Sequence, residues 1–174
     1  MRAWGVGLVS LLVTMTAAGG VLGPGNAGFE QGMAGWELLP TGRPGTARVA
    51  ADTAVARGGT GSLRVACAEA CEATVASLPV RLEVGRPYRL RGMIRTAGAI
   101  SDPLSRYPTA VPATLSMASF PFTNHTPAVG ADADWTAVET VFIATRGEDR
   151  VQLHLGRNGT ATGTAWFDDL AVEE

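Results

Sequence analysis

Turn-forming residues divide this chain into short segments, and that spacing limits the folds open to it more than any other feature. Turn signals that contain glycine or proline recur about every ten residues, and the segments between them are rich in valine and threonine and poor in long helix formers. The predicted strands are residues 47–50, 62–67, 73–80, 87–96, 113–120, 135–144, 150–157 and 164–172. So many strands in one small domain predict an all-β fold, a two-sheet antiparallel β-sandwich.

Apolar and polar side chains alternate along two of these segments. In residues 88–95, one face is predicted to carry Tyr88, Leu90, Gly92 and Ile94, and the other Arg89, Arg91, Met93 and Arg95. In residues 151–155 the aliphatic side chains point one way and Gln152 and His154 the other. Successive side chains leave opposite sides of a sheet, so both segments are expected to be half-exposed strands.

The first 22 residues have the layout of a secretory signal peptide, in which one arginine precedes a short apolar stretch and small residues follow. An uncleaved membrane anchor is the alternative, but the apolar stretch is short for a hydrocarbon core of about 30 Å. We therefore expect residues 1–22 to be a signal peptide and residues 23–174 a single domain. After cleavage nothing else is expected to hold the chain in a membrane.

Composition narrows the partners and the place of action. All basic residues are arginine, and the net charge is −2. Binding to phosphates needs a surplus of positive charge, so nucleic acid and anionic membranes are not expected partners. An arginine-only, alanine- and glycine-rich chain is typical of a high-GC bacterium. We expect a monomer that is secreted, or held in the periplasm or cell envelope.

Cys67 and Cys71 are the only cysteines, and in an exported protein an even pair predicts a disulfide. Two adjacent antiparallel strands joined by residues 68–70 would bring the sulfurs face to face across a hairpin. The alternative is half of a metal site, but such a C-x3-C pair lacks its other two ligands.

Five short motifs follow one another along the chain: Asn26–Glu30 with Gly35–Trp36, Gly61–Val65, Gly85–Tyr88, Asp134–Trp135 and Trp166–Leu170. In this order they resemble the galactose-binding-like jelly-roll modules of carbohydrate-binding families 4, 9 and 22. The resemblance covers nearly the entire mature chain. It implies a jelly roll and a non-catalytic module that recognises a polysaccharide or a cell-envelope glycan.

The resemblance also implies a structural Ca²⁺ ion where the first strand meets the last. The matching positions are Glu30 and Asp168, and further oxygens would come from backbone carbonyls around residues 52–59. On the last strand, Asp168 is expected to share a face with Trp166, Leu170 and Val172, so its carboxylate needs compensation. The alternative is that Asp168 accepts backbone N–H groups or pairs with an arginine. Asp169 is expected to be exposed.

No catalytic arrangement is evident. The chain lacks G-x-S-x-G, H-E-x-x-H and a glycine-rich loop that leads into a helix. We therefore expect a binding module and not an enzyme.

Sugar binding usually combines exposed aromatic rings with polar groups. The resemblance assigns Trp36, Trp135 and Trp166 to the core, which leaves Tyr107, Phe122 and His125 as candidate ligand-binding residues. Arg89, Arg91 and Arg95 form a second candidate, which with Gln152 and His154 could hold an acidic polysaccharide. The alternative is that these arginines only make the surface soluble.

Two functions stay open at this stage. One is glycan binding outside the cell. The other is a structural or protein-interaction sandwich of the cell envelope with no glycan ligand, favoured by the scarcity of aromatic residues outside the expected core.

Overall fold

The computed structural model describes residues 20, 22–41, 46–101, 111–120 and 123–174. The expected signal peptide lies almost wholly outside the described residues, as do Tyr107 and Phe122. In the part of the chain that is described, no helix is long and apolar enough to cross a membrane.

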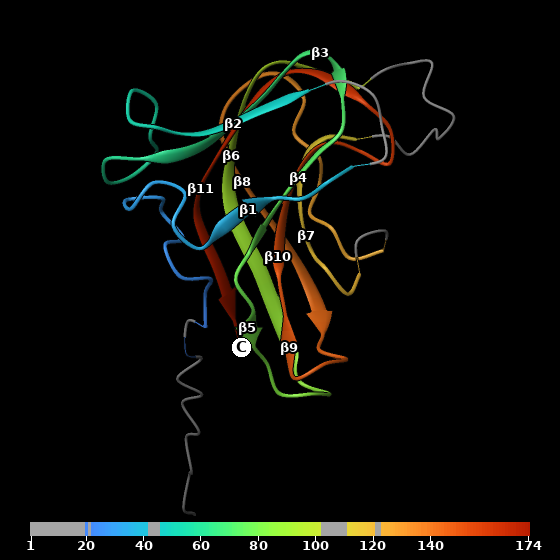
Figure 1. The fold of residues 1–174 in the computed structure, drawn as a ribbon. Coiled ribbons are helices and arrows are strands. Elements are labelled where there is room, and N and C mark those ends of the chain that lie inside the picture. The colour runs from blue at the N-terminus through green and yellow to red at the C-terminus, as the bar shows by residue number, and fades with distance from the viewer. Residues whose placement is uncertain (1–19, 21, 42–45, 102–110, 121–122) are drawn as a thin grey trace, which may run out of the picture.

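Two antiparallel sheets pack face to face, as Figure 1 shows. The five-stranded sheet has the order β2 (Ala47–Asp52), β3 (Ser62–Cys71), β11 (Ala161–Glu173), β6 (Pro87–Ser101) and β8 (Ala131–Ile143). The four-stranded sheet has the order β1 (Trp36–Leu38), β4 (Ala73–Ser77), β10 (Val151–Arg157) and β7 (Val111–Met117). A two-stranded ribbon, at the same end of the molecule as the C-terminus, consists of β5 (Val80–Arg81) and β9 (Glu148–Asp149). The predicted all-β sandwich is confirmed.

Apolar side chains from both sheets fill the space between the layers. β7 packs against β6 and β11, and β10 packs against β11 and β3. Fully buried side chains at the centre include Phe167, Leu90 and Leu153, and each contributes roughly 1.5–3 kcal/mol by leaving water. Trp36 is also buried, as expected, and its ring centroid lies 5.1 Å from that of Phe29.

The alternation predicted for residues 88–95 is confirmed in β6, where Tyr88, Leu90 and Ile94 are buried and Arg89 and Arg91 are exposed. The prediction for residues 151–155 is wrong in one respect. Leu153 faces the core as expected, but His154 on the opposite face is only 3% exposed. β10 lies between β4 and β7, so His154 is enclosed by side chains from both neighbours.

The disulfide joins Cys67 to Cys71 as predicted. The prediction that the two cysteines face each other across a hairpin is wrong. Both cysteines lie in β3, and their Cα atoms are 5.7 Å apart. Four residues of regular strand would span about 13 Å, so residues 68–70 bulge out of the strand. The pairing with β11 shifts at the same place. The chain then crosses to the other sheet, because β4 pairs with β1 and β10 and not with β3.

Candidate functional site

The outer face of the five-stranded sheet carries an indole ring at its centre. Trp166 lies on β11, the middle strand, and its direct cross-strand neighbours are Arg64 on β3 and Arg95 on β6. The guanidinium carbons of these two arginines lie 6.0 and 5.8 Å from the centroid of the ring. Both distances are in the range of cation–π attraction. The indole is therefore held between two positive charges.

Asp52 anchors the polar edge of this ring. The indole Nε1–H of Trp166 donates to Asp52 Oδ2 at 2.9 Å. This hydrogen bond is the main cause that lowers the pKa of Asp52, with smaller contributions from backbone N–H groups and from the charge of Arg64. Asp52 is thus an ionised acceptor that fixes the orientation of the indole on the sheet.

Two shallow hollows lie near Trp166, one lined by its ring and one beside its cross-strand neighbour Arg64. One, of about 310 Å³, is lined by Trp166 itself with Arg95, Thr96, Ala97, Asp132, Ala133 and Asp134. The other, of about 390 Å³, lies on the side of Arg64 and is lined by Thr46, Arg48, Arg64, Ala66, Cys67, Ala68, Gly163 and Thr164. Together they form a surface with both apolar and hydrogen-bonding walls, the combination that sugar ligands require.

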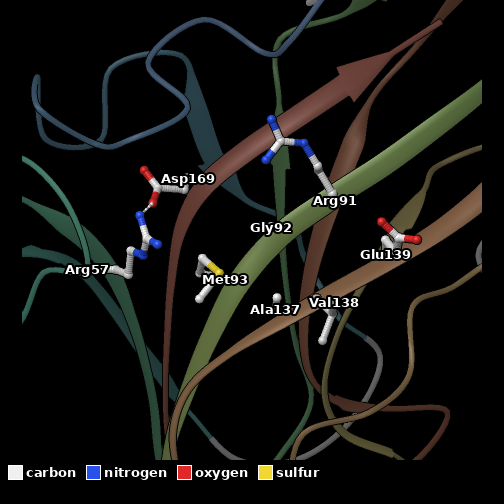
Figure 2. A pocket seen from close by; sticks show the side chains of 8 residues that line it. All are labelled: Arg57, Arg91, Gly92, Met93, Ala137, Val138, Glu139 and Asp169. Atoms are coloured by element: carbon white, nitrogen blue, oxygen red, sulfur yellow. Dashed lines mark hydrogen bonds and ion pairs between the residues drawn. The ribbon is translucent and has the colours of Figure 1, made fainter.

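A third hollow, of about 370 Å³, lies further along the same face, between β6, β8 and the loop that carries Arg57. Figure 2 shows Arg91, Met93 and Glu139 around it, together with Arg57 and Asp169. Arg57 and Asp169 are joined by an ion pair of 3.0 Å, so part of the polar wall is already paired.

The predicted arginine stripe lies on this face, and each member is paired with a carboxylate. Arg89 lies 3.7 Å from Glu139, and Arg95 lies 3.9 Å from Asp134. Arg91 donates two hydrogen bonds to Glu173, which raise the pKa of Arg91 and lower that of Glu173. Gln152 and His154 do not join the stripe, because β10 belongs to the other sheet. A site that combines all five residues is therefore ruled out.

Trp135 and Trp166 are half-buried on the outer face and are not core residues as the resemblance implied. On β11 the inward residue is Phe167, so its neighbour Trp166 points outward. Near residue 169 the pairing with β6 shifts and Asp169 has φ 49°, which restores the inward direction for Leu170 and Val172. On β8, Thr136 pairs with the inward residue Ile94, so its neighbour Trp135 lies on the outer side. A sequence prediction that assumes strict alternation from Val172 back to Trp166 therefore places the indole inside, because it does not include the bulge.

Glu30 and Asp168 lie near each other, as the resemblance implied, where the N-terminal segment meets β11. The oxygens Asp168 Oδ1 and Glu30 Oε1 lie 3.7 and 3.8 Å from the point that a Cβ on Gly28 would occupy. Asp168 is fully buried, and this burial raises its pKa against the effect of the N–H donors around it. Thr60, through its hydroxyl first and its N–H second, lowers the pKa of Glu30.

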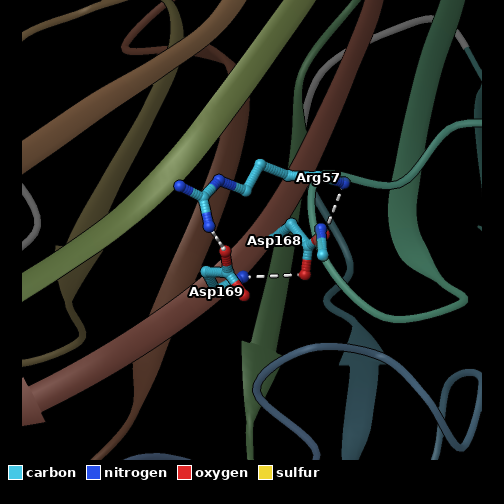
Figure 3. Close-up of polar contacts among 4 residues, drawn as sticks. Arg57, Asp168 and Asp169 are labelled. Carbon is cyan, nitrogen blue, oxygen red and sulfur yellow. Dashed lines mark hydrogen bonds and ion pairs between the residues drawn. The ribbon is translucent and has the colours of Figure 1, made fainter.

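The loop before β3 supplies N–H groups to both carboxylates, as the alternative for Asp168 anticipated. Figure 3 shows Asp168 Oδ2 accepting from the backbone N–H of Arg57, at 2.8 Å. Gly58 N donates to the same oxygen at 3.2 Å, and Asp169 N donates to Oδ1 at 2.8 Å. Asp169 is half-exposed and pairs with Arg57. Among the described residues, no group of three or more His, Cys, Asp or Glu side chains is arranged to hold a metal ion.

His125 lies beside the four-stranded sheet, away from the arginine stripe, where its residue bridges to Ser116 of β7. Its ring Nδ1 contacts Thr126 O at 2.8 Å. Tyr107 and Phe122, the other candidates for that surface, are outside the described residues. Of the predicted ligand residues that the structure describes, His125 therefore lies by one sheet and Arg89, Arg91 and Arg95 lie on the other.

His154 is the centre of a buried polar chain on the four-stranded sheet. Its Nδ1 lies 3.1 Å from Thr74 Oγ1, and its Nε2 lies 2.8 Å from Ser116 Oγ. Burial, followed by the nearby charges of Arg157 and His125, lowers the pKa of His154 from 6.5 to about 3. A neutral imidazole with so low a pKa is a weak base, so this Ser–His contact is poorly suited to activate a nucleophile.

No protein-family model matches the chain, and no curated protein matches it. Solved structures do. A family 16 carbohydrate-binding module is 18% identical, with a TM-score of 0.55 over 86% of this chain and 97% of that one. The module TmCBM61, solved with β-1,4-galactotriose, is also 18% identical, with a TM-score of 0.56 over 85% of this chain and 94% of that one.

The chain has the jelly-roll fold of carbohydrate-binding modules. The same fold occurs in an enzyme, the Stig cyclase Fisc from Fischerella sp. TAU, which was solved with an indole compound. This cyclase is 14% identical, with a TM-score of 0.61 over 90% of this chain and 98% of that one. The jelly-roll fold therefore serves both binding modules and cyclases, and the function of this chain has to be argued from its site.

Proposed function

We propose that this chain is an exported, monomeric, non-catalytic glycan-binding module, and that its ligand lies across the outer face of the five-stranded sheet. The observation that carries the proposal is the half-buried indole of Trp166, which lines one hollow on that face and whose cross-strand neighbour Arg64 lines a second. A flat apolar ligand that covers an aromatic side chain on the open face of a sheet removes apolar surface from water, and this burial favours binding.

The chemistry of this face suits a sugar. The C–H face of a pyranose packs on aromatic carbon, while its hydroxyls need donors and acceptors at the rim. Arg64 and Arg95 supply donors beside the ring, and Asp132 and Asp134 supply acceptors in the adjoining hollow. The fold adds support, because one similar module was solved with β-1,4-galactotriose and another is a xylan-binding domain.

Retention on polysaccharides tests the proposal. The chain is run through gels that contain single soluble polysaccharides, and retardation is compared between wild type and Trp166→Ala. We expect Trp166→Ala to weaken retention about tenfold or more, because it removes the stacking surface. Trp166→Phe, which keeps a ring but loses the hydrogen bond to Asp52, should retain part of the binding. Circular dichroism checks that each variant is folded.

Two results would contradict the proposed surface. Retention of Trp166→Ala equal to wild type, with loss in Tyr107→Ala or Phe122→Ala, would contradict the surface around Trp166 and favour the aromatic candidates predicted from the sequence. Absence of retention on every polysaccharide would favour the alternative function, a structural or protein-contact domain.

We further propose that a calcium ion binds between Glu30 and Asp168. Calcium requires six to eight oxygens. Asp168 Oδ1 accepts from Asp169 N and Glu30 Oε1 accepts from Thr60 N, and a carboxylate oxygen has two lone pairs, which leaves acceptor capacity for a cation. Such an ion would fix the N-terminal segment on β11 and offset the burial of Asp168.

Melting in calcium and in chelator tests this second proposal. An ion present at about 100 times its dissociation constant stabilises the folded state by about 2.7 kcal/mol. We expect calcium to raise the melting midpoint of wild type and to leave that of Asp168→Asn or Glu30→Gln unchanged. Magnesium serves as the control for general salt effects. A wild-type melting midpoint that is the same in calcium and in chelator would contradict calcium binding at this site.

A further inference from the structure

We infer that the glycan is acidic, and that Arg48 and Arg64 bind its carboxylate or sulfate groups in the hollow beside Trp166. This inference rests on the proposed function and adds the class of ligand. The hollow has a volume of about 390 Å³, and Arg48 and Arg64 are its only charged lining residues in the part of the chain that is described.

The strand register brings the two arginines to one place. Arg48 on β2 pairs with Ala66, and Arg64 on β3 pairs with Ala50, so the arginines are diagonal neighbours on the same face. Diagonal neighbours are about 7–8 Å apart at Cα, a distance that long side chains span easily. The opposing side chains are small, which leaves room between the guanidinium groups. Thr46 and Thr164 add hydroxyl groups to the rim of the hollow.

Arg48 and Arg64 differ from the arginines of the predicted stripe in their ion pairs. Arg89, Arg91 and Arg95 each have a carboxylate partner, which an incoming anion would have to displace. No ion pair joins Arg48 or Arg64 to any other described residue, although the charge of Arg64 acts on Asp52 from a longer range. A guanidinium group binds a carboxylate or sulfate through two parallel hydrogen bonds. The unpaired arginines are therefore the ones able to bind an external anion.

The neighbourhood favours a glycan over a nucleic acid. Trp166 lies next to Arg64 and offers a stacking surface to the sugar ring that carries the acid group. The face also carries Asp52, Asp134 and Glu139, and the net charge of the chain is −2, both of which oppose a continuous polyphosphate. A cation next to an aromatic ring suits a sugar that presents an acid group and an apolar face together.

Affinity gels with defined probes test this inference. The acidic probes are polygalacturonate and chondroitin sulfate, the neutral probe is β-1,4-galactan, and a single-stranded DNA oligonucleotide is the nucleic-acid probe. We expect retention on an acidic probe that falls as sodium chloride rises, because salt screens the ion pairs. Arg48→Ala/Arg64→Ala should weaken this retention by about ten- to a hundredfold, as expected for lost hydrogen bonds between charged groups.

A matched control separates the site from net charge. Arg81→Ala/Arg146→Ala removes the same charge from exposed positions near the β5–β9 ribbon, and it should keep wild-type retention. Retention on neutral galactan with none on either acidic probe, or acidic retention that Arg48→Ala/Arg64→Ala leaves unchanged, would overturn the acidic ligand at this hollow and leave glycan binding intact. Binding to DNA but to no glycan, or to no probe at all, would overturn the proposed function as well. An equal loss of acidic retention in both double variants would show that the effect comes from net charge, and it would contradict the proposed site.

Discussion

As the pH falls from about 6.5 to about 3, wild-type protein is expected to lose about 1.4 kcal/mol of unfolding free energy per pH unit relative to His154→Gln. The cause is the buried imidazole of His154, whose pKa is lowered to about 3 in the folded protein. Between the two pKa values the unfolded chain binds one proton that the folded chain does not bind. Acid therefore shifts the equilibrium toward the unfolded state, and above pH 6.5 this contribution is constant.

Denaturant unfolding at a series of pH values measures this effect. Ser116→Ala is the control, because it removes the hydroxyl next to Nε2 but leaves His154 in place. It should lower stability by a constant amount, about 1 kcal/mol, and keep the wild-type slope. Parallel curves for wild type and His154→Gln would show that His154 does not titrate with a lowered pKa in the folded protein.

Gly163→Ala is expected to destabilise the protein by about 3 kcal/mol or more, enough to unfold a marginal domain at moderate temperature. Gly163 has φ 97°, where an L-residue with a side chain is strained. A Cβ at this position would overlap the carbonyl group of Gly98 and lie 2.7 Å from Ala99 N. These are backbone atoms of the paired strand β6, which cannot move aside without breaking the sheet.

Gly85→Ala is a matched control for that substitution. Gly85 has φ 86°, close to the value at Gly163, but no atom lies within 4 Å of its hypothetical Cβ. The difference in unfolding free energy between the two variants isolates the overlap from the dihedral strain, which costs about 1 kcal/mol at each position. If both variants lose the same stability, β6 and β11 can separate at the bulge with little loss.

Several features of this protein follow from local chemistry and could be predicted from the sequence. Alternation along residues 88–95 places Leu90 and Ile94 inside and Arg89 and Arg91 outside, because the side-chain period of a strand is two. The Cys67–Cys71 disulfide follows from the presence of a single cysteine pair. The two-sheet architecture follows from the number and spacing of strands, because half-apolar strands need a second layer to cover them.

The candidate site depended on information that is not local. Trp166 looked like a core residue, yet a bulge near Asp169 resets the alternation and leaves the indole on the outer face. Arg48 and Arg64 become neighbours only through the pairing of β2 with β3, which no single segment encodes.

Sequence alone thus determined the kind of fold, the inward face of β6 and the disulfide partners, because each depends on residue type and on a period within one segment. The tertiary structure decided that β3 and β4 part into different sheets at the disulfide, that His154 is enclosed and that Arg48 joins Arg64 beside Trp166. These features arise from register shifts and from strands far apart in the chain. A residue's exposure on a sheet is set by its neighbours on the adjoining strands as much as by its own chemistry.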